Sequence, residues 1–342
     1  MNIKKIGLSA LAGSLAVVSA NAVELSVSGK TEVTYMSNDI STTGNPYGMG
    51  NSITFSGSGD VNGMTATYTA ALGDGGQANS NTSETFASSS LMLDMGDMGT
   101  VGFDQGVGEF GVGTIDDKMP YAYEEIWHNV GTSNGLRAAG GTNVLGYKNT
   151  IAGVAVSLEL DPGHTNNSAK GASGDGGSTG TGTEDSGYNI AITSASLYDG
   201  VNAGIGYGKE ESTVDTAFGD SDSSYATAFV TYAIGGATLG YQQSEGYGGS
   251  VGTSSNDVSI YGVSYSVNEN FAVSYGRMDN DFALGTNGNT FNTKVTEKTT
   301  GVGASYTLGS AAVRVLASEG KNIGGTDGIK NDNLEVSLML AF

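Results

Sequence analysis

The sequence predicts an all-β fold, a transmembrane antiparallel up-and-down β-barrel of about 16 strands. Three observations predict it. Apolar and polar residues alternate in short segments along the chain, the connections between these segments are by turns short and long, and the chain ends inside such a segment, on Phe342. Because successive side chains of a strand point to opposite faces, this alternation is typical of strands with one apolar and one polar face.

The first 22 residues are expected to be a signal peptide and no part of the fold. They read MNIKKIGLSALAGSLAVVSANA, with two lysines ahead of an apolar run over about 6–18 and an A-x-A cleavage signal at 20–22. The apolar run is too short to span a bilayer, which favours a cleaved secretory peptide. We therefore expect one barrel domain over 23–342.

Composition and charge exclude several classes of function. The chain has 342 residues, no Cys, 56 Gly and a net charge of −21, and without the signal peptide 12 basic residues face 35 acidic ones, a net charge of −23. This balance argues against nucleic acid or an anionic membrane surface as a partner. No later window holds about 18 apolar residues, so we expect no transmembrane helix. The low hydrophobic content of 38 % would indicate disorder unless the pattern imposes order.

The first strand shows the pattern that the others repeat. Leu25 and Val27 share one face, and Glu24 and Ser26 share the other. The full set of predicted strands is 23–36, 51–59, 64–73, 85–95, 99–105, 143–149, 153–160, 187–194, 201–209, 223–233, 236–243, 257–266, 270–277, 297–306, 311–318 and 333–342.

The connections between these strands alternate in length. The short ones are 60–63, 96–98, 150–152, 194–200, 234–236, 266–270 and 307–310. The long ones have about 11 to 37 residues rich in Gly, Ser, Asn and Asp, of which 161–187 is the extreme case. This alternation is expected of a meander whose two ends face different compartments, with strands of about ten residues covering an apolar band about 25 Å tall.

The C-terminal strand explains how the sheet would close. Leu334, Leu338 and Phe342 lie on one face of 333–342. Pairing with 23–36 would remove both sheet edges, as lipid requires. A closed sheet of about 16 strands leaves a water-filled channel.

The signal peptide, the meander, the loop alternation and the terminal LMLAF resemble the general porins of Gram-negative outer membranes. The resemblance implies an integral outer-membrane protein in contact with lipid, a homotrimer, and passive diffusion of ions and small hydrophilic solutes. In that family a C-terminal Phe is the signal read by the outer-membrane assembly machinery, and Phe342 fits it.

The longest connection, about 106–142, is the candidate functional segment. In porins the third long loop folds into the barrel and narrows it, which requires aromatics to pack on the wall and carboxylates to face the pore. This segment holds Phe110, Tyr121, Tyr123 and the only Trp, Trp127. Its candidate pore carboxylates are Glu109, Asp116, Asp117, Glu124 and Glu125. We expect it to fold inward; the alternative is an acidic surface loop.

Porins set such carboxylates against basic residues of the wall. Alternation points Lys30, Lys148 and Arg314 into the lumen, and Arg137 lies at the end of the segment. The family usually has a denser arginine cluster, so isolated lumen charges are the alternative here. Further carboxylates predicted to point inward are Glu24, Glu32, Asp94, Glu159 and Glu335. A lumen rich in carboxylates concentrates and favours cations.

Other chemistry is poorly supported. His128 and His164 have no H-x-x-x-H or Cys partner, so no metal site is predicted, although Ca²⁺ on loop carboxylates stays an alternative. No catalytic arrangement is visible, and no enzyme or cofactor is expected. A secreted acidic adhesin or surface-layer protein, or a substrate-specific channel for sugars or anions, are the alternative functions.

Overall fold

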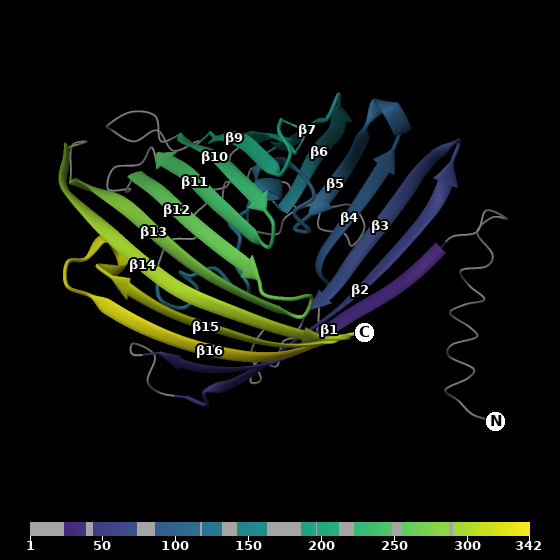
Figure 1. Ribbon diagram of the computed structural model, residues 1–342. Coiled ribbons are helices and arrows are strands. Elements are labelled where there is room, and N and C mark those ends of the chain that lie inside the picture. Colours follow the sequence, from purple (N-terminus) through teal and green to yellow (C-terminus); the bar gives the residue numbers. More distant parts are fainter. Residues whose placement is uncertain are drawn as a thin grey trace.

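The computed structural model describes residues 24–38, 44–73, 86–116, 118–131, 142–162, 186–195, 197–211, 222–247, 255–286 and 290–342. These residues form 16 antiparallel strands in one closed barrel (Figure 1). The strands are β1 (Glu24–Asn38), β2 (Tyr47–Val61), β3 (Met64–Gly73), β4 (Phe86–Asp94), β5 (Thr100–Gln105), β6 (Thr142–Ile151), β7 (Val154–Asp161), β8 (Gly187–Ser194), β9 (Val201–Glu210), β10 (Ser223–Ile234), β11 (Ala237–Tyr247), β12 (Ser255–Ser266), β13 (Phe271–Thr286), β14 (Thr290–Leu308), β15 (Ala311–Lys321) and β16 (Lys330–Ala341). Three short 3-10 helices are η1 (Gly96–Met98), η2 (Gly111–Ile115) and η3 (Ile323–Gly325).

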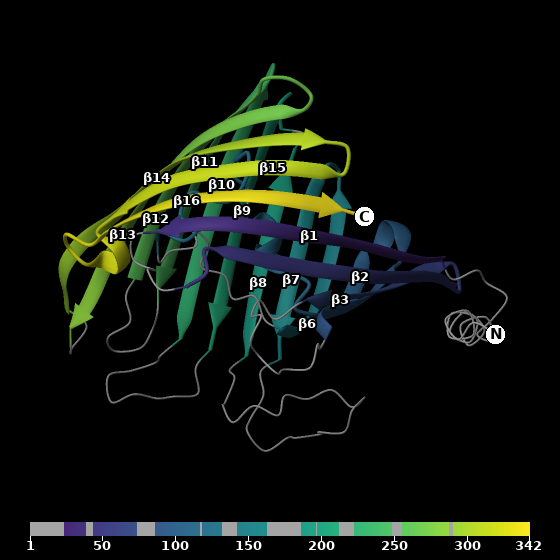
Figure 2. The same ribbon diagram turned by 90° about the horizontal axis from the view of Figure 1, so that it is seen from below.

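The barrel closes where the sequence predicted it. Strands β1 and β16 pair in register from Lys30 opposite Ala341 to Asn38 opposite Asn333, and Figure 2 shows them side by side. Past the last paired strand residue, the N–H of Phe342 donates to the carbonyl of Gly29 at 2.9 Å, and the Gly29 N–H donates back at 2.8 Å. The terminal strand therefore has no open edge.

The two faces of the wall are as predicted. Outward-facing Val33, Val313 and Leu338 are each between 43 % and 48 % exposed, whereas inward-facing Ser337 and Leu316 are each 1 % exposed. Small polar residues dominate much of the inner face, and apolar residues dominate the outer one. None of the helices in the described part of the chain is long and apolar enough to cross a membrane.

Two strands are much longer than the sequence predicted. β13 has 16 residues and β14 has 19, whereas the alternation had placed them at 270–277 and 297–306. The outward residues turn polar there, for example Asp279 opposite Lys298, but the backbone pairing continues. Apolar alternation therefore reports the lipid-facing part of a strand, and its hydrogen-bonded ladder extends beyond that part.

Candidate functional site

The segment between β5 and β6 lies against the inner face of the barrel. The N–H of Gly111 donates to Ser157 Oγ at 2.8 Å, and that of Val112 donates to Asn189 Oδ1 at 2.7 Å. Further along, the N–H of Ala122 donates to the hydroxyl of Ser274 at 2.9 Å. The described part of the segment therefore follows the wall from β7 to β13, and in Figure 1 its blue chain runs within the ring of strands.

Apolar side chains fill the space between this segment and the wall. The segment contributes five apolar side chains that are at most 2 % exposed, Phe110, Val112, Ile115, Ile126 and Val130. Three of these, Val112, Ile115 and Ile126, join a cluster whose wall members are Ala191, Tyr225, Phe229, Val258, Ile260 and Met278. Burial of this area stabilises the seated segment by the hydrophobic effect. A purely solvated loop would have no such core.

Glycines on the wall make room for the segment. Four of them lie directly opposite one another across β11–β14, namely Gly240, Gly262, Gly276 and Gly301. A Cβ on Gly262 would lie 2.9 Å from Cδ of Pro120, and one on Gly276 would lie 2.8 Å from Cγ2 of Ile126. Any side chain on this glycine row would displace the segment, because real Cβ contacts are longer.

Wall glycines also make room for the start of the segment. The Phe110 ring occupies the space that a side chain on Gly146 would fill, and Phe110 is 1 % exposed. A Cβ on Gly206 would lie 2.8 Å from Cδ1 of Ile115. Sequence reasoning missed these wall glycines, although their position at inward places of predicted strands was a readable signal.

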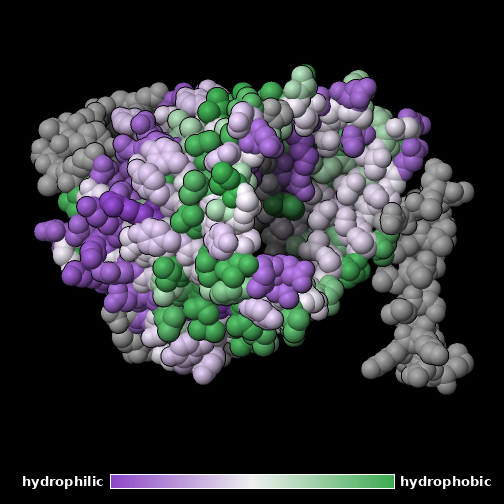
Figure 3. Space-filling model, in the orientation of Figure 1, coloured by the Kyte–Doolittle hydropathy of each residue, from purple (hydrophilic) through white to green (hydrophobic). Residues whose placement is uncertain are grey.

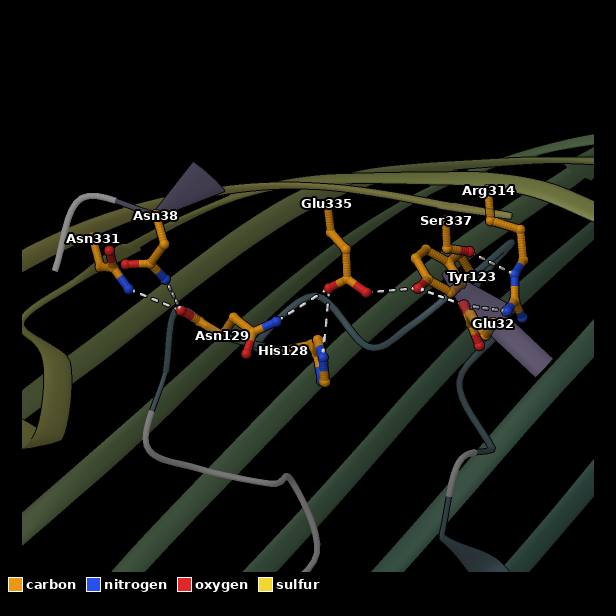
Figure 4. A network of polar contacts seen from close by, with 9 residues as sticks. All are labelled: Glu32, Asn38, Tyr123, His128, Asn129, Arg314, Asn331, Glu335 and Ser337. Atoms are coloured by element: carbon orange, nitrogen blue, oxygen red, sulfur yellow. Dashed lines mark hydrogen bonds and ion pairs between the residues drawn. The ribbon is translucent and has the colours of Figure 1, made fainter. Parts of the chain in front are cut away.

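A polar network ties the segment to the seam between β1 and β16 (Figure 4). The Tyr123 hydroxyl donates to Glu335 Oε1 at 2.6 Å and lies 3.1 Å from Glu32 Oε1. Asn129 Nδ2 donates to Glu335 Oε2 at 3.1 Å, and His128 Nε2 lies 3.5 Å from the same oxygen. Glu335, which is 4 % exposed, thus gathers three side chains of the segment onto β16.

Arg314 completes this network on the wall. Its guanidinium forms an ion pair with Glu32 and lies 4.5 Å from the centroid of the Tyr123 ring. Its Nε donates to Ser337 Oγ at 3.2 Å. On the other side of the network, the carbonyl of Asn129 accepts a hydrogen bond from Asn331 Nδ2 at 2.9 Å.

The surroundings of the segment shift the pKa of three of its groups. Burial raises the pKa of Glu124, the negative charges of Glu335 and Glu32 raise it further, and His128 opposes them. Burial also raises the pKa of Tyr123, and its hydrogen bond to Glu335 adds to that effect. The pKa of Tyr121 is raised by burial first and by Glu125 second. Both tyrosines therefore stay protonated donors at any physiological pH.

The predicted basic residues do not all face across the lumen. Lys148 Nζ lies 2.6 Å from Glu109 Oε2, and Arg314 is held by Glu32. Because the segment lies on the wall, Glu109 contacts the wall residue Lys148 directly and neutralises its charge. Lys30 is exposed and inward-facing on β1.

The remaining predicted carboxylates gather at one recess. Asp116, Glu124 and Glu125 line a cavity of about 250 Å³ between segment and wall, together with Lys118 and Arg314. A second cavity, of about 610 Å³, is lined by residues that include Asp94, Glu109 and Lys148.

Two of the predicted site residues, Asp117 and Arg137, lie outside the described residues, as does His164. Among the residues that the structure describes, no group of three or more His, Cys, Asp or Glu side chains is placed to hold a metal ion.

Comparison with known proteins gives the family. A model of the family described as Gram-negative porin matches residues 7–318. No curated protein sequence matches the chain. Among solved structures, OmpF of Salmonella typhi in complex with daunomycin has 14 % identity and a TM-score of 0.67, covering 94 % of this chain and 98 % of its own.

Two further structures show the same fold. The trimer form of OmpT from Vibrio cholerae has 12 % identity and a TM-score of 0.67, covering 94 % of this chain and 100 % of its own. An anion-selective porin from Comamonas acidovorans has 16 % identity and a TM-score of 0.62, with coverage of 94 % and 100 %. These identities establish the fold alone, whereas the family match spans most of the chain. The chain therefore belongs to the Gram-negative porin family, and is an outer-membrane β-barrel that acts as a general, non-enzymatic channel for passive diffusion.

Proposed function

We propose that this porin prefers cations and that the segment 106–131, seated on the inner wall, forms its constriction. One observation carries the proposal: three carboxylates, Asp116, Glu124 and Glu125, border the recess beside the segment against two bases, Lys118 and Arg314, of which Arg314 is paired with Glu32 on the wall. Fixed carboxylates at a narrow place favour cations.

The charge of the whole chain also favours a preference for cations. Outside the candidate segment and the named wall bases, 30 acidic residues face 7 basic ones in 23–342. Low-dielectric walls focus such a field and enrich counter-ions at the pore mouths. The preference weakens at high salt, because the screening length falls from about 8 Å at 0.15 M to about 3 Å at 1 M.

Three further features belong to this proposal. Residues 1–22 are a cleaved signal peptide and the mature chain is 23–342, as the A-x-A signal indicates. The mature protein is a homotrimer, as the trimer form of OmpT suggests. Phe342 carries the signal for the assembly machinery, which its place at the barrel seam supports.

The reversal potential in a dilute salt gradient across a planar bilayer tests the selectivity. Replacing Asp116 with Asn, and Glu124 and Glu125 with Gln, should lower the K⁺/Cl⁻ permeability ratio severalfold. The matched control neutralises three exposed carboxylates of the short turns, Asp97, Asp199 and Glu269, and should change the ratio much less.

Two outcomes would overturn parts of the proposal. If the segment variant keeps the wild-type reversal potential while the turn variant shifts it, the segment is not the constriction. If the wild-type current saturates with one solute at low concentration, the channel is substrate-specific and not a general one.

A further inference from the structure

Three lysines form a row across neighbouring strands on the outer face of the barrel. Lys298 of β14 lies directly opposite Lys321 of β15, which lies directly opposite Lys330 of β16. They share the outward face with Val302 and Val313, which are 53 % and 48 % exposed. Like charges directly opposite one another destabilise a sheet. On its other side Lys298 lies opposite Asp279, whose carboxylate is paired with Arg277 of its own strand at 2.7 Å.

Internal ion pairs do not account for the row. Lys321 Nζ lies 2.8 Å from Glu319 Oε1, in a pair whose side chains are 49 % and 47 % exposed. In the described part of the chain, neither Lys298 nor Lys330 takes part in an ion pair. Asp332 lies opposite Glu319. It is the next outward residue of β16 after Lys330, on the side of the apolar band. Two of the three ammonium groups are thus available to an external anion.

The row stands at one height on all three strands. On each strand the lysine is the second outward residue beyond the last apolar one, in the orders Val302–Thr300–Lys298, Ala317–Glu319–Lys321 and Leu334–Asp332–Lys330. Four residues of strand are about 13 Å long, or about 10 Å in height at a tilt near 40°. A headgroup layer is roughly 5 to 8 Å thick, and lysine side chains bend toward it.

The molecular surface agrees with this placement. Figure 3 shows apolar residues as a green band over the middle of β14–β16 and hydrophilic residues beyond it, over the ends of β13–β16 that lie away from the C-terminus. The lysines belong to the end of the strands that carries the long connections. In outer-membrane barrels this end faces outward from the cell, at the outer leaflet.

The outer surface as a whole is not basic. On the same face of β11–β13, Glu245 lies opposite Asp257, which lies opposite Asp281. The whole chain carries 14 basic residues against 35 acidic ones. The overall charge would repel anionic lipids, so the row is a local exception to the expectation drawn from net charge.

We propose that Lys298, Lys321 and Lys330 form a binding site for phosphate groups of the lipids in the outer leaflet. The three lysines stand on adjacent strands, which lie about 5 Å apart, so one or two phosphates can reach the whole row. Bound phosphate removes the repulsion within the row and ties β14–β16 to the lipid layer. The site needs only an outer-membrane barrel and is independent of the ion preference of the pore.

Binding of lipid A to the purified full-length mature barrel in neutral detergent tests the proposal, with native mass spectrometry to count bound lipids. The probe is lipid A carrying both phosphates, compared with the same lipid after enzymatic removal of them. The triple variant K298Q/K321Q/K330Q should bind the phosphorylated lipid roughly one hundredfold more weakly, at about fivefold per lysine. The triple Arg variant should bind it like the wild type.

Two controls make the result specific. K209Q removes an outward lysine of β9 whose Nζ lies 2.6 Å from Asp222, and it should leave lipid binding unchanged. Single-channel conductance confirms that each variant is folded, and K298Q and K330Q singly replace the triple variant if it does not fold. Equal binding of the two lipids by the wild type, or wild-type binding by the triple Gln variant or by both single variants, would overturn the proposal.

Discussion

Glu335 contacts three side chains of the seated segment. Its two oxygens receive Tyr123 and Asn129 of the segment, and His128 lies beside it. The raised pKa of Tyr123 keeps its hydroxyl protonated, so the donor in the shortest of these contacts is always present. The neighbouring Glu124 loses its charge at a higher pH than an ordinary glutamate, because burial and the nearby carboxylates raise its pKa.

The pH dependence of selectivity should therefore begin above the range of an ordinary glutamate. Since the raised pKa favours the neutral form, lowering the pH removes the charge of Glu124 before that of exposed carboxylates, and the K⁺/Cl⁻ ratio should fall early. In E124Q this early part of the titration should be missing, while the later part remains. A wild-type curve identical to that of E124Q would show that Glu124 does not contribute to selectivity.

At the scale of elements, the strands were the most predictable part of the molecule. Alternation placed β3 and β8 at their observed bounds, 64–73 and 187–194, because lipid on one side and water on the other impose a strict period of two. It missed the outer ends of β13 and β14, where the outward residues turn polar, although Met278 and Phe282 are buried on the inward face. The glycine row was also missed: its members stand at inward places of the predicted strands, but only the fold sets them opposite one another and beneath the segment.

The glycine row yields a direct test of how the segment is seated. In G276L the new side chain would meet Ile126, 2.8 Å from the position of its Cβ, and push the segment toward the pore axis. Overpacking of this kind typically costs 1–3 kcal/mol. Single-channel conductance should fall, while circular dichroism should show unchanged strand content.

G50L is the matched control for that experiment. Gly50 is an inward glycine of β2, opposite Glu32, and a Cβ there meets nothing within 4 Å. Its conductance should stay closer to that of the wild type. Equal losses in both variants would mean that lumen volume, and not displacement of the segment, explains the effect.

At the scale of the whole molecule, the sequence predicted the closure of the barrel but not the ion pairs of the candidate site. The seam between 23–36 and 333–342 follows from the rule that lipid tolerates no open sheet edge, and it was confirmed. The residues of the candidate site were found by type and segment. Their pairing was not, because Lys148 meets Glu109 and Arg314 meets Glu32 only through the folded course of the chain.

Phe342 takes part in the closure of the barrel and is the proposed signal for outer-membrane assembly, and these two roles can be tested separately. Its ring lies over Gly29, with Cε2 2.6 Å from where a Cβ would stand, and its backbone adds two hydrogen bonds to the seam. The side chain is nevertheless 72 % exposed, so it contributes little to packing within the barrel.

We therefore expect deletion of Phe342 to leave refolding of the purified chain into detergent nearly unchanged, as judged by heat-modifiable mobility. In cells the same deletion should lower the outer-membrane level several-fold while the signal peptide is still removed. Phe342→Tyr keeps an aromatic terminus and should restore the level. An unchanged level in the deletion variant would refute the assembly role, and a parallel loss of refolding would mean that the residue acts through barrel stability alone.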